Sequence, residues 1–299
     1  MPPRPLPHSE RRSERIAVAM NARAALFRAG VAGLALMRLT PDGSKAEIAT
    51  ALEVTRSCLQ ALPPDILDSL PEVDTVTGYR EWAETYDRPG NPLIALEEPV
   101  MTWLLERLPA GLALDVAAGT GRHTLRLAAS GHRVLAVDLS PAMLRGLGDL
   151  ADVRRIVGDM TALPVADAAM DVVVCSLALT HLPVLGPAIA EIARVLRPGG
   201  RAVLSDIHPL VAATGGMAYY PTADGEVRFI RNHVHWPSSY LAAFGASGLL
   251  VRDCFEPRFG GESGVPHLMS SPTALVDAAA STAFAALPGV LVWDLERAG

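Results

Sequence analysis

The chain has 299 residues, of which half are hydrophobic and 19% are charged, and its formal net charge is −6 at pH 7. This length can bury a full core as one large domain or as two modest ones, and the composition excludes a disordered chain. The acidic balance argues against nucleic acid as a main partner, because phosphate binding needs a basic surface. Lys45 is the only lysine, and the many Arg, Ala, Gly and Pro residues are typical of a GC-rich bacterial genome.

The cysteines and the hydrophobic segments indicate where the protein works. Cys58, Cys175 and Cys254 are widely spaced and form no C-x-x-C pair, so we expect neither a disulfide framework nor a cysteine metal site. The Ala-rich segment 16–39 is interrupted by three arginines and falls short of the roughly 18 uninterrupted apolar residues of a membrane span. We therefore expect a cytoplasmic protein with no membrane contact.

The N-terminal region reads as helical. From Glu10 to Leu39 apolar residues recur at helical spacing, and Pro41-Asp42-Gly43 ends this pattern. Ser44 is suited to cap a second helix that reaches about Leu62. Residues 1–75 are therefore predicted to be a helical extension. It could simply pack, cap a substrate pocket as a lid, or pair two subunits in a homo-oligomer.

From residue 112 onward short β-branched runs alternate with helical stretches, which is typical of β/α units with a mostly parallel sheet. Seven strands are predicted, at Leu112–Val116, Arg133–Val137, Val153–Val157, Met170–Ser176, Arg201–Ser205, Leu249–Phe255 and Val290–Leu295. Two helices are predicted before the first strand, over 76–87 and 94–108. Insertions at 207–236 and 257–288 interrupt the alternation, and Asp224-Gly225 in the first is a hairpin turn signal. Residues 76–299 are thus predicted to be one α/β domain.

A glycine-containing turn joins the first predicted strand to a helix. The strand carries Asp115 and leads into Ala118-Gly-Thr-Gly121, and a helix follows over 122–130. Glycines in such a turn let a ligand approach the backbone and the N–H groups at the helix start. Asp138 ends the next strand, where a carboxylate suits the hydroxyls of a ribose. A dinucleotide fingerprint would need a third glycine at the position of Thr124, so the turn does not favour a nicotinamide cofactor.

Five segments, in family order and at family spacing, carry a resemblance to a known family. They are Asp115-Val-Ala-Ala-Gly-Thr-Gly121, Val137-Asp138-Leu-Ser-Pro-Ala-Met-Leu144, Gly158-Asp-Met-Thr-Ala-Leu-Pro164, Asp171-Val-Val-Val-Cys-Ser-Leu-Ala-Leu-Thr-His-Leu182 and Ala193-Arg-Val-Leu-Arg-Pro-Gly-Gly200. Over about 79–256 the chain resembles the class I S-adenosylmethionine-dependent methyltransferases, most closely the small-molecule branch with the ubiquinone/menaquinone-biosynthesis-type enzymes. The resemblance implies a Rossmann-like, seven-stranded, mostly parallel sheet with helices on both faces and an antiparallel last strand. It also implies S-adenosylmethionine as cofactor and a small-molecule acceptor.

The resemblance implies twelve cofactor-binding residues. They are Tyr79, Tyr86, Asp115, Ala117, Gly119, Gly121, Asp138, Leu139, Asp159, Met160, Ser176 and Leu177. In this set the glycines contact the methionine end, Asp138 binds the ribose, and Asp159 accepts from the adenine amino group. The two tyrosines cover the cofactor from the N-terminal side. The chain departs from the family pattern at Ala117, which stands in place of the first glycine of the loop.

A general base is needed if the acceptor is a hydroxyl, and histidine is the usual choice near neutral pH. His208 follows the fifth predicted strand, at the edge where open α/β sheets bind ligands, and His235 closes the first insertion. These two histidines are the predicted catalytic residues. His181 commonly has a packing or loop-bonding role in such families. His233 and His235 have metal-like spacing, but no carboxylate or cysteine completes a set, so no metal is predicted.

The sequence thus predicts transfer of a methyl group from S-adenosylmethionine to a small organic acceptor at an O, N or C atom. The arginine-rich composition and the family branch favour bacterial secondary metabolism. The alternative is a protein of the same fold that binds the cofactor but catalyses a non-methylating reaction, for example a pericyclic one. A nucleic-acid methyltransferase is disfavoured by the net charge and by the lack of an Asn/Asp-Pro-Pro-Tyr or Asn/Asp-Pro-Pro-Phe tetrapeptide after the fourth strand.

Overall fold

The structure, a computed structural model, describes residues 26, 28–60, 70–223, 226–260 and 282–299. These residues fall into two compact units. The first holds the described residues up to Pro71 together with 226–227, 259–260 and 282–287, and the second holds 72–223, 228–258 and 288–299.

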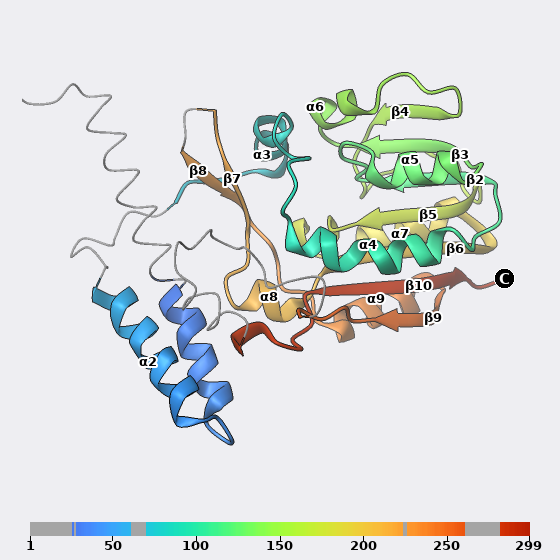
Figure 1. The fold of residues 1–299 in the computed structure, drawn as a ribbon. Coiled ribbons are helices and arrows are strands. Elements are labelled where there is room, and N and C mark those ends of the chain that lie inside the picture. The colour runs from blue at the N-terminus through green and yellow to red at the C-terminus, as the bar shows by residue number, and fades with distance from the viewer. Residues whose placement is uncertain (1–25, 27, 61–69, 224–225, 261–281) are drawn as a thin grey trace, which may run out of the picture. The chain divides into compact units, whose positions relative to one another are not determined.

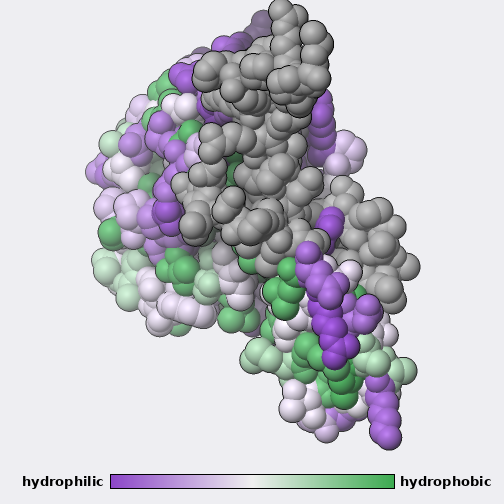
Figure 2. All heavy atoms as spheres, turned by 90° about the vertical axis from the view of Figure 1, so that its left-hand side faces the viewer, coloured by the Kyte–Doolittle hydropathy of each residue, from purple (hydrophilic) through white to green (hydrophobic). Residues whose placement is uncertain are grey.

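The first unit contains a helix over 28–39 and helix α2, Lys45–Gln60. Ser44 caps α2 as predicted: its N–H donates to Oε2 of Glu47 over 2.9 Å, and the Glu47 N–H donates back to the Ser44 hydroxyl over 3.3 Å. The unit has a small core of its own: Val31, Ala32, Ala35, Leu39, Ala51, Val54, Cys58 and Ala283. Hydrophobic and hydrophilic side chains lie side by side on the surface of its helices (Figure 2). The first part of the predicted first helix, 10–25, and the end of the second, 61–62, lie outside the described residues.

The second unit is built on a seven-stranded sheet with the order β4-β3-β2-β5-β6-β10-β9. Its strands are β2 (Leu112–Val116), β3 (Arg133–Asp138), β4 (Val153–Val157), β5 (Met170–Ser176), β6 (Leu196–Ile207), β9 (Leu249–Phe255) and β10 (Val290–Arg297). Strands β2 to β6 pair in parallel, and β10 runs antiparallel to both β6 and β9. The chain therefore winds outward from β2 to β4 and returns to β5 on the other side of β2. A doubly wound sheet binds ligands at this switch point.

Helices cover both faces of this sheet. They are α4 (Pro92–Leu105), α5 (Arg122–Ala129), α6 (Pro141–Leu144), α7 (Gly186–Val195) and α9 (Pro237–Ser247). Helices α4 and α5 lie on one face and α7 and α9 on the other (Figure 1). The apolar runs of the central strands are buried on both sides, as in Leu114, Val173 and Leu204, which are fully buried. Buried parallel strands read as continuous hydrophobic runs, which explains why their positions were predictable.

Four of the seven predicted strands, β2, β4, β5 and β9, have the predicted bounds. The predicted strand Arg201–Ser205 was too short at both ends, because β6 runs from Leu196 to Ile207. In the structure Leu196 already pairs with Met170, and a register shift between Met170 and Val172 absorbs the Pro-Gly-Gly segment inside the strand.

The helices before the sheet also differ slightly from prediction. Helix α3, Thr75–Trp82, ends five residues early and continues as turns to Asp87. Helix α4 begins two residues earlier than predicted, because the Asn91 side chain accepts from the Leu93 N–H and Pro92 occupies the first turn.

The first insertion forms helix α8 (Pro209–Ala213) and two strands of a small sheet with the order β1-β8-β7. These strands are β1 (Glu72–Val73), β7 (Ala218–Pro221) and β8 (Val227–Ile230). The two strands that flank the predicted hairpin turn, expected at Met217–Tyr220 and Glu226–Ile230, are confirmed to within one residue. The turn at 224–225 lies outside the described residues, as does 261–281 of the second insertion. Within the described ranges, no helix is long and apolar enough to cross a membrane.

Candidate active site

A cavity of about 330 Å³ opens at the carboxyl ends of β2, β3, β4 and β5. It is lined by Thr75, Tyr79, Tyr86, Ala117, Gly119, Asp138, Leu139, Met143, Gly158, Asp159, Met160, Thr161, Ser176, Leu177, Ala178, His181 and Leu182. Ten of the twelve residues expected to bind the cofactor are in this lining. Asp115 and Gly121 are not in the lining. Their contacts, with Thr124 and Leu147 respectively, stabilise the loop between β2 and α5.

The loop after β2 owes its shape to left-handed backbone conformations. Gly119 has φ 59° and Gly121 has φ 98°, and a Cβ on Gly121 would come within 2.1 Å of Cδ2 of Leu147. Packing alone therefore requires glycine at 121. Ala117 also has a positive φ, 55°, which explains why a glycine suits this position. The left-handed conformation costs an alanine about 1–2 kcal/mol relative to glycine. Asp115 is buried and accepts a hydrogen bond of 2.6 Å from the Thr124 hydroxyl.

Asp138 presents its carboxylate at the end of β3. Oδ2 accepts from the Gly119 N–H over 2.8 Å and Oδ1 accepts from the Ser140 N–H over 2.7 Å. These bonds fix the carboxylate between two loops and leave each oxygen with a further lone pair for a ligand hydroxyl. Burial raises the pKa of Asp138 above its ordinary value, although the two backbone bonds oppose this.

Asp159 lies at the start of the loop that follows β4. Its Oδ1 accepts from both the N–H and the hydroxyl of Thr161 over 2.8 Å each, which closes a tight turn. Asp159 also bridges to Ala162 through the backbone. Met160 beside it is half-buried and packs against the main hydrophobic core. The loop therefore offers a carboxylate and an apolar surface to the same cavity.

An aromatic cluster covers the cavity from α3 and the turns after it. Tyr79 stacks on Trp82 with 5.9 Å between ring centroids, and Tyr86 meets Tyr79 edge-on at 6.0 Å. Asp87 accepts a hydrogen bond of 2.7 Å from the Thr120 hydroxyl, which ties this segment to the glycine loop. Burial raises the pKa of Tyr86 to about 12, so its phenol is neutral at physiological pH.

His181, which the sequence did not single out as catalytic, lies in the cavity wall. The Tyr79 hydroxyl is 2.7 Å from Nε2 of His181, and Nδ1 of His181 is 3.0 Å from the Arg231 carbonyl oxygen. A carbonyl only accepts, so Nδ1 carries the proton and Nε2 accepts from Tyr79. Burial lowers the pKa of His181, which keeps the ring neutral near pH 7. Tyr79 and His181 lie 102 residues apart, and no sequence spacing predicts their contact.

The two histidines predicted to be catalytic lie outside the cavity lining. His208 caps α8, with Nδ1 accepting from the Leu210 N–H, and its Nε2 lies 3.2 Å from Oε1 of Glu256. Nε2 of His235 lies 2.7 Å from the Leu182 carbonyl oxygen, so this nitrogen is engaged by the backbone. Their role as base stays a prediction. Among the described residues no group of three His, Cys, Asp or Glu side chains could hold a metal ion.

A buried polar network that the sequence did not predict lies behind Ser176 of the cavity wall. Glu97 on α4 is fully buried and accepts from the hydroxyls of Ser176 and Ser205, and its Oε2 lies 2.5 Å from Nη2 of Arg122. Burial acts to raise the pKa of Glu97, but His123 beside it and the Arg122 charge outweigh this and lower it to about 2. Arg122 was a usable signal, because a cation at a helix start opposes the helix dipole and needs an anionic partner.

Residues 114–204 match the sequence profile of a family described as a methyltransferase domain. This region runs from β2 into β6 and supplies most of the cavity lining. Over this region the chain is similar to the methyltransferase domains of that family.

Two relatives and one solved structure show how far the likeness extends. The chain is 41% identical over 102 residues to a demethylmenaquinone methyltransferase of Mycolicibacterium vanbaalenii, which covers 34% of this chain and 44% of that protein. It is 28% identical over 220 residues to an uncharacterised methyltransferase of Emericella nidulans, covering 60% and 77% of the two chains. An S-adenosylmethionine-dependent methyltransferase from Mesorhizobium loti superposes with a TM-score of 0.50 at 21% identity, covering 68% of this chain and 98% of that one. The chain spans about half the length of the demethylmenaquinone methyltransferases that it matches.

Proposed function

We propose that this protein transfers a methyl group from S-adenosylmethionine to a small organic acceptor. The observation that carries the proposal is the single cavity in which the glycine loop, Asp138, Asp159 and the strand-end residue Ser176 meet. Each of these stands where the methyltransferase resemblance implies a cofactor contact.

The cavity residues suit the chemistry of the whole cofactor. Asp138 would hold the ribose hydroxyls, and Asp159 with Met160 would hold the adenine. Arg122, whose charge is paired with Glu97 beneath the cavity, donates from Nη2 to the hydroxyl of the cavity residue Ser176 over 2.9 Å and so helps to hold it in place. When bound, S-adenosylmethionine supplies an electrophilic methyl group on a sulfonium centre. The work left to the protein is to align the acceptor, exclude water and remove a proton.

The Tyr79–His181 pair can perform the proton transfer. An acceptor hydroxyl placed against the Tyr79 oxygen would pass its proton to that oxygen while the Tyr79 proton moves to Nε2 of His181. The Arg231 carbonyl, which already accepts from Nδ1, stabilises the resulting imidazolium. Burial raises the pKa of Tyr79 well above its ordinary value, so the phenol relays a proton and is not itself the stored base. This favours an acceptor atom that bears a proton, above all a hydroxyl. His208 and His235 are the alternative bases. The proposed setting in bacterial secondary metabolism rests on the composition and on the family branch that the chain resembles.

We also propose a contact role for the N-terminal helical extension, residues 1–75. Met37 is 73% exposed and Leu59 is 53% exposed, so the helices of this unit carry apolar side chains on their surface. Exposed apolar groups of this kind often find a partner surface. Light scattering on the full chain tests the homo-oligomer: a dimer that Met37→Glu or Leu59→Glu dissociates supports it, and a monomeric unmutated protein contradicts it.

Incubation with methyl-labelled S-adenosylmethionine and panels of phenols, alcohols, amines and quinol precursors tests the proposed function. We expect label in an acceptor that bears a hydroxyl. Tight binding of S-adenosylhomocysteine with no label transferred to any panel would instead favour the non-methylating alternative.

A further inference from the structure

The loop that joins β4 to β5 is fastened along its length by two side chains of α7. The loop begins with the cavity-lining residues 158–161. Two residues further along, Leu163 donates its N–H to Oε2 of Glu191 over 2.7 Å and accepts at its carbonyl from Nη2 of Arg194 over 3.1 Å. Both α7 residues lie outside the cavity lining.

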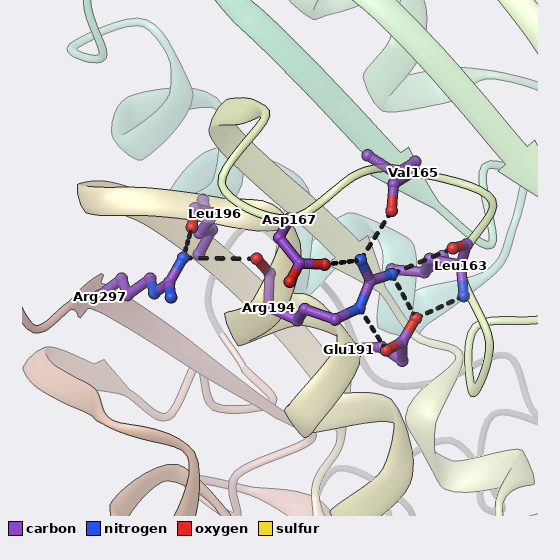
Figure 3. Close-up of polar contacts among 7 residues, drawn as sticks. All are labelled: Leu163, Val165, Asp167, Glu191, Arg194, Leu196 and Arg297. Atoms are coloured by element: carbon purple, nitrogen blue, oxygen red, sulfur yellow. Dashed lines mark hydrogen bonds and ion pairs between the residues drawn. The ribbon is translucent and has the colours of Figure 1, made fainter.

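A single guanidinium makes most of these contacts. Nη1 of Arg194 donates to the Val165 carbonyl over 2.7 Å and to Oδ1 of Asp167 over 2.6 Å, while Nε donates to Oε1 of Glu191 over 2.6 Å (Figure 3). The planar fork of arginine makes such a fixed set of bonds, which the single ammonium of lysine cannot reproduce. Residues 163, 165 and 167 are therefore held by one rigid group.

The backbone around Arg194 is itself anchored. Its carbonyl accepts from the Ala168 N–H over 2.9 Å and from Nη1 of Arg297 over 3.3 Å, and Arg297 also donates to the Leu196 carbonyl (Figure 3). The end of α7 thus ties the loop to the last strand of the sheet. The hydrogen bonds that Arg194 donates to the Glu191 and Asp167 carboxylates raise the pKa of Arg194, so the guanidinium stays charged at every physiological pH.

We infer that Arg194 is a positioning residue for the adenine end of the cofactor, acting through the β4–β5 loop on Asp159. The connection is short: Asp159 bridges to Ala162, whose N–H donates to the Asp159 carbonyl over 3.1 Å, and the fixed residue Leu163 follows directly. Fixing Leu163 and Val165 therefore fixes the turn that presents the Asp159 carboxylate. The inference rests on the proposed cofactor role of this cavity.

Calorimetric titration with S-adenosylhomocysteine and with S-inosylhomocysteine, in which oxygen replaces the adenine amino group, tests the inference. We expect Arg194→Met to weaken binding of S-adenosylhomocysteine at least tenfold and binding of the inosine analogue less than threefold. The affinity of Arg194→Lys for S-adenosylhomocysteine should lie between those of the unmutated protein and Arg194→Met. Arg197→Met is the matched control, because Arg197 pairs with Asp171 and has no bond to the loop; both affinities should stay within twofold.

Unchanged S-adenosylhomocysteine affinity in Arg194→Met, or an equal loss for both ligands, would overturn the inference. A purely structural defect would lower the bound stoichiometry or the melting temperature without changing the ratio of the two affinities. Arg194→Lys decides the question if Arg194→Met does not fold: an unchanged affinity ratio in the lysine variant also overturns it. Failure of the unmutated protein to bind S-adenosylhomocysteine would instead refute the proposed function.

Discussion

The hydroxyl of Tyr79, on α3, lies 2.7 Å from Nε2 of His181, which follows β5. This contact joins the N-terminal cover of the cavity to the carboxyl edge of the sheet. It also places a neutral imidazole, whose Nε2 accepts from the Tyr79 hydroxyl, in a wall of the cavity that would receive the acceptor. The pair therefore determines what substitution of either side chain, and a change of pH, should do to turnover.

Replacing His181 with alanine should lower kcat for a hydroxyl acceptor about 10²–10⁴-fold, the usual value of general-base catalysis. Tyr79→Phe should lower kcat in the same direction, because it interrupts the relay while keeping the ring stacked on Trp82. The Kd for S-adenosylhomocysteine should change less than fivefold in Tyr79→Phe. His235→Ala and His208→Ala are the comparison variants. If His235→Ala or His208→Ala loses turnover and His181→Ala does not, the base is the histidine replaced in the inactive variant and not His181.

The acidic limb of the kcat/KM profile should have its midpoint below pH 6.5. Burial lowers the pKa of His181 from that ordinary value, so its neutral, proton-accepting form persists to lower pH. Activity should therefore be retained as pH falls through 6.5 and be lost only below it. A steady-state pH profile with a hydroxyl acceptor measures this, and a midpoint above 7 would contradict the assignment.

Asp138→Ala should weaken S-adenosylhomocysteine binding by about 1.5–3 kcal/mol, the value of hydrogen bonds to a charged group. Asp138→Asn should lose less, since an amide oxygen still accepts from one hydroxyl. Asp149→Ala is a suitable control because its side chain is 99% exposed and lies outside the cavity lining. Equal affinities in Asp138→Ala and Asp149→Ala, measured by calorimetry, would show that the ribose is bound elsewhere.

Glu97→Gln should destabilise the fold at pH 7 by about 3 kcal/mol, because it leaves the Arg122 charge unpaired beneath the cavity. The folded-state pKa of Glu97 is lowered from 4.5 to about 2. Its contribution to stability is therefore present above about pH 4.5 and is lost as pH falls towards 2. The gap between variant and unmutated protein should shrink over that window.

Urea unfolding at several pH values, with Glu98→Gln as control, measures the gap. Glu98 pairs with Arg126 on the surface of the same helix and is 44% exposed, so its substitution should cost under about 1 kcal/mol. Equal costs for Glu97→Gln and Glu98→Gln would contradict a structural role for the buried network.

The sequence predicted the parts of the molecule that depend on local pattern. The buried strands, the Ser44 cap and the left-handed glycine loop all leave signals within a few residues, and so most residues that line the cavity could be predicted. The sequence did not predict contacts between residues that lie far apart along the chain, because no local pattern links the two partners. Tyr79 with His181, Glu97 with Ser205, and Arg194 with Val165 are of this kind. The sequence did not favour His181 for that reason, since a histidine in a strand-end loop has the same local sequence whether it packs or faces a cavity.

Isothermal titration of the full chain with S-adenosylhomocysteine tests the central claim most directly, because the cavity must bind this product whatever the acceptor is. We predict one site per chain with a Kd in the micromolar range or tighter, and a loss of affinity in Asp138→Ala. Absence of binding heat at several temperatures, with no rise in melting temperature on adding the ligand, would contradict a methyltransferase role for this protein.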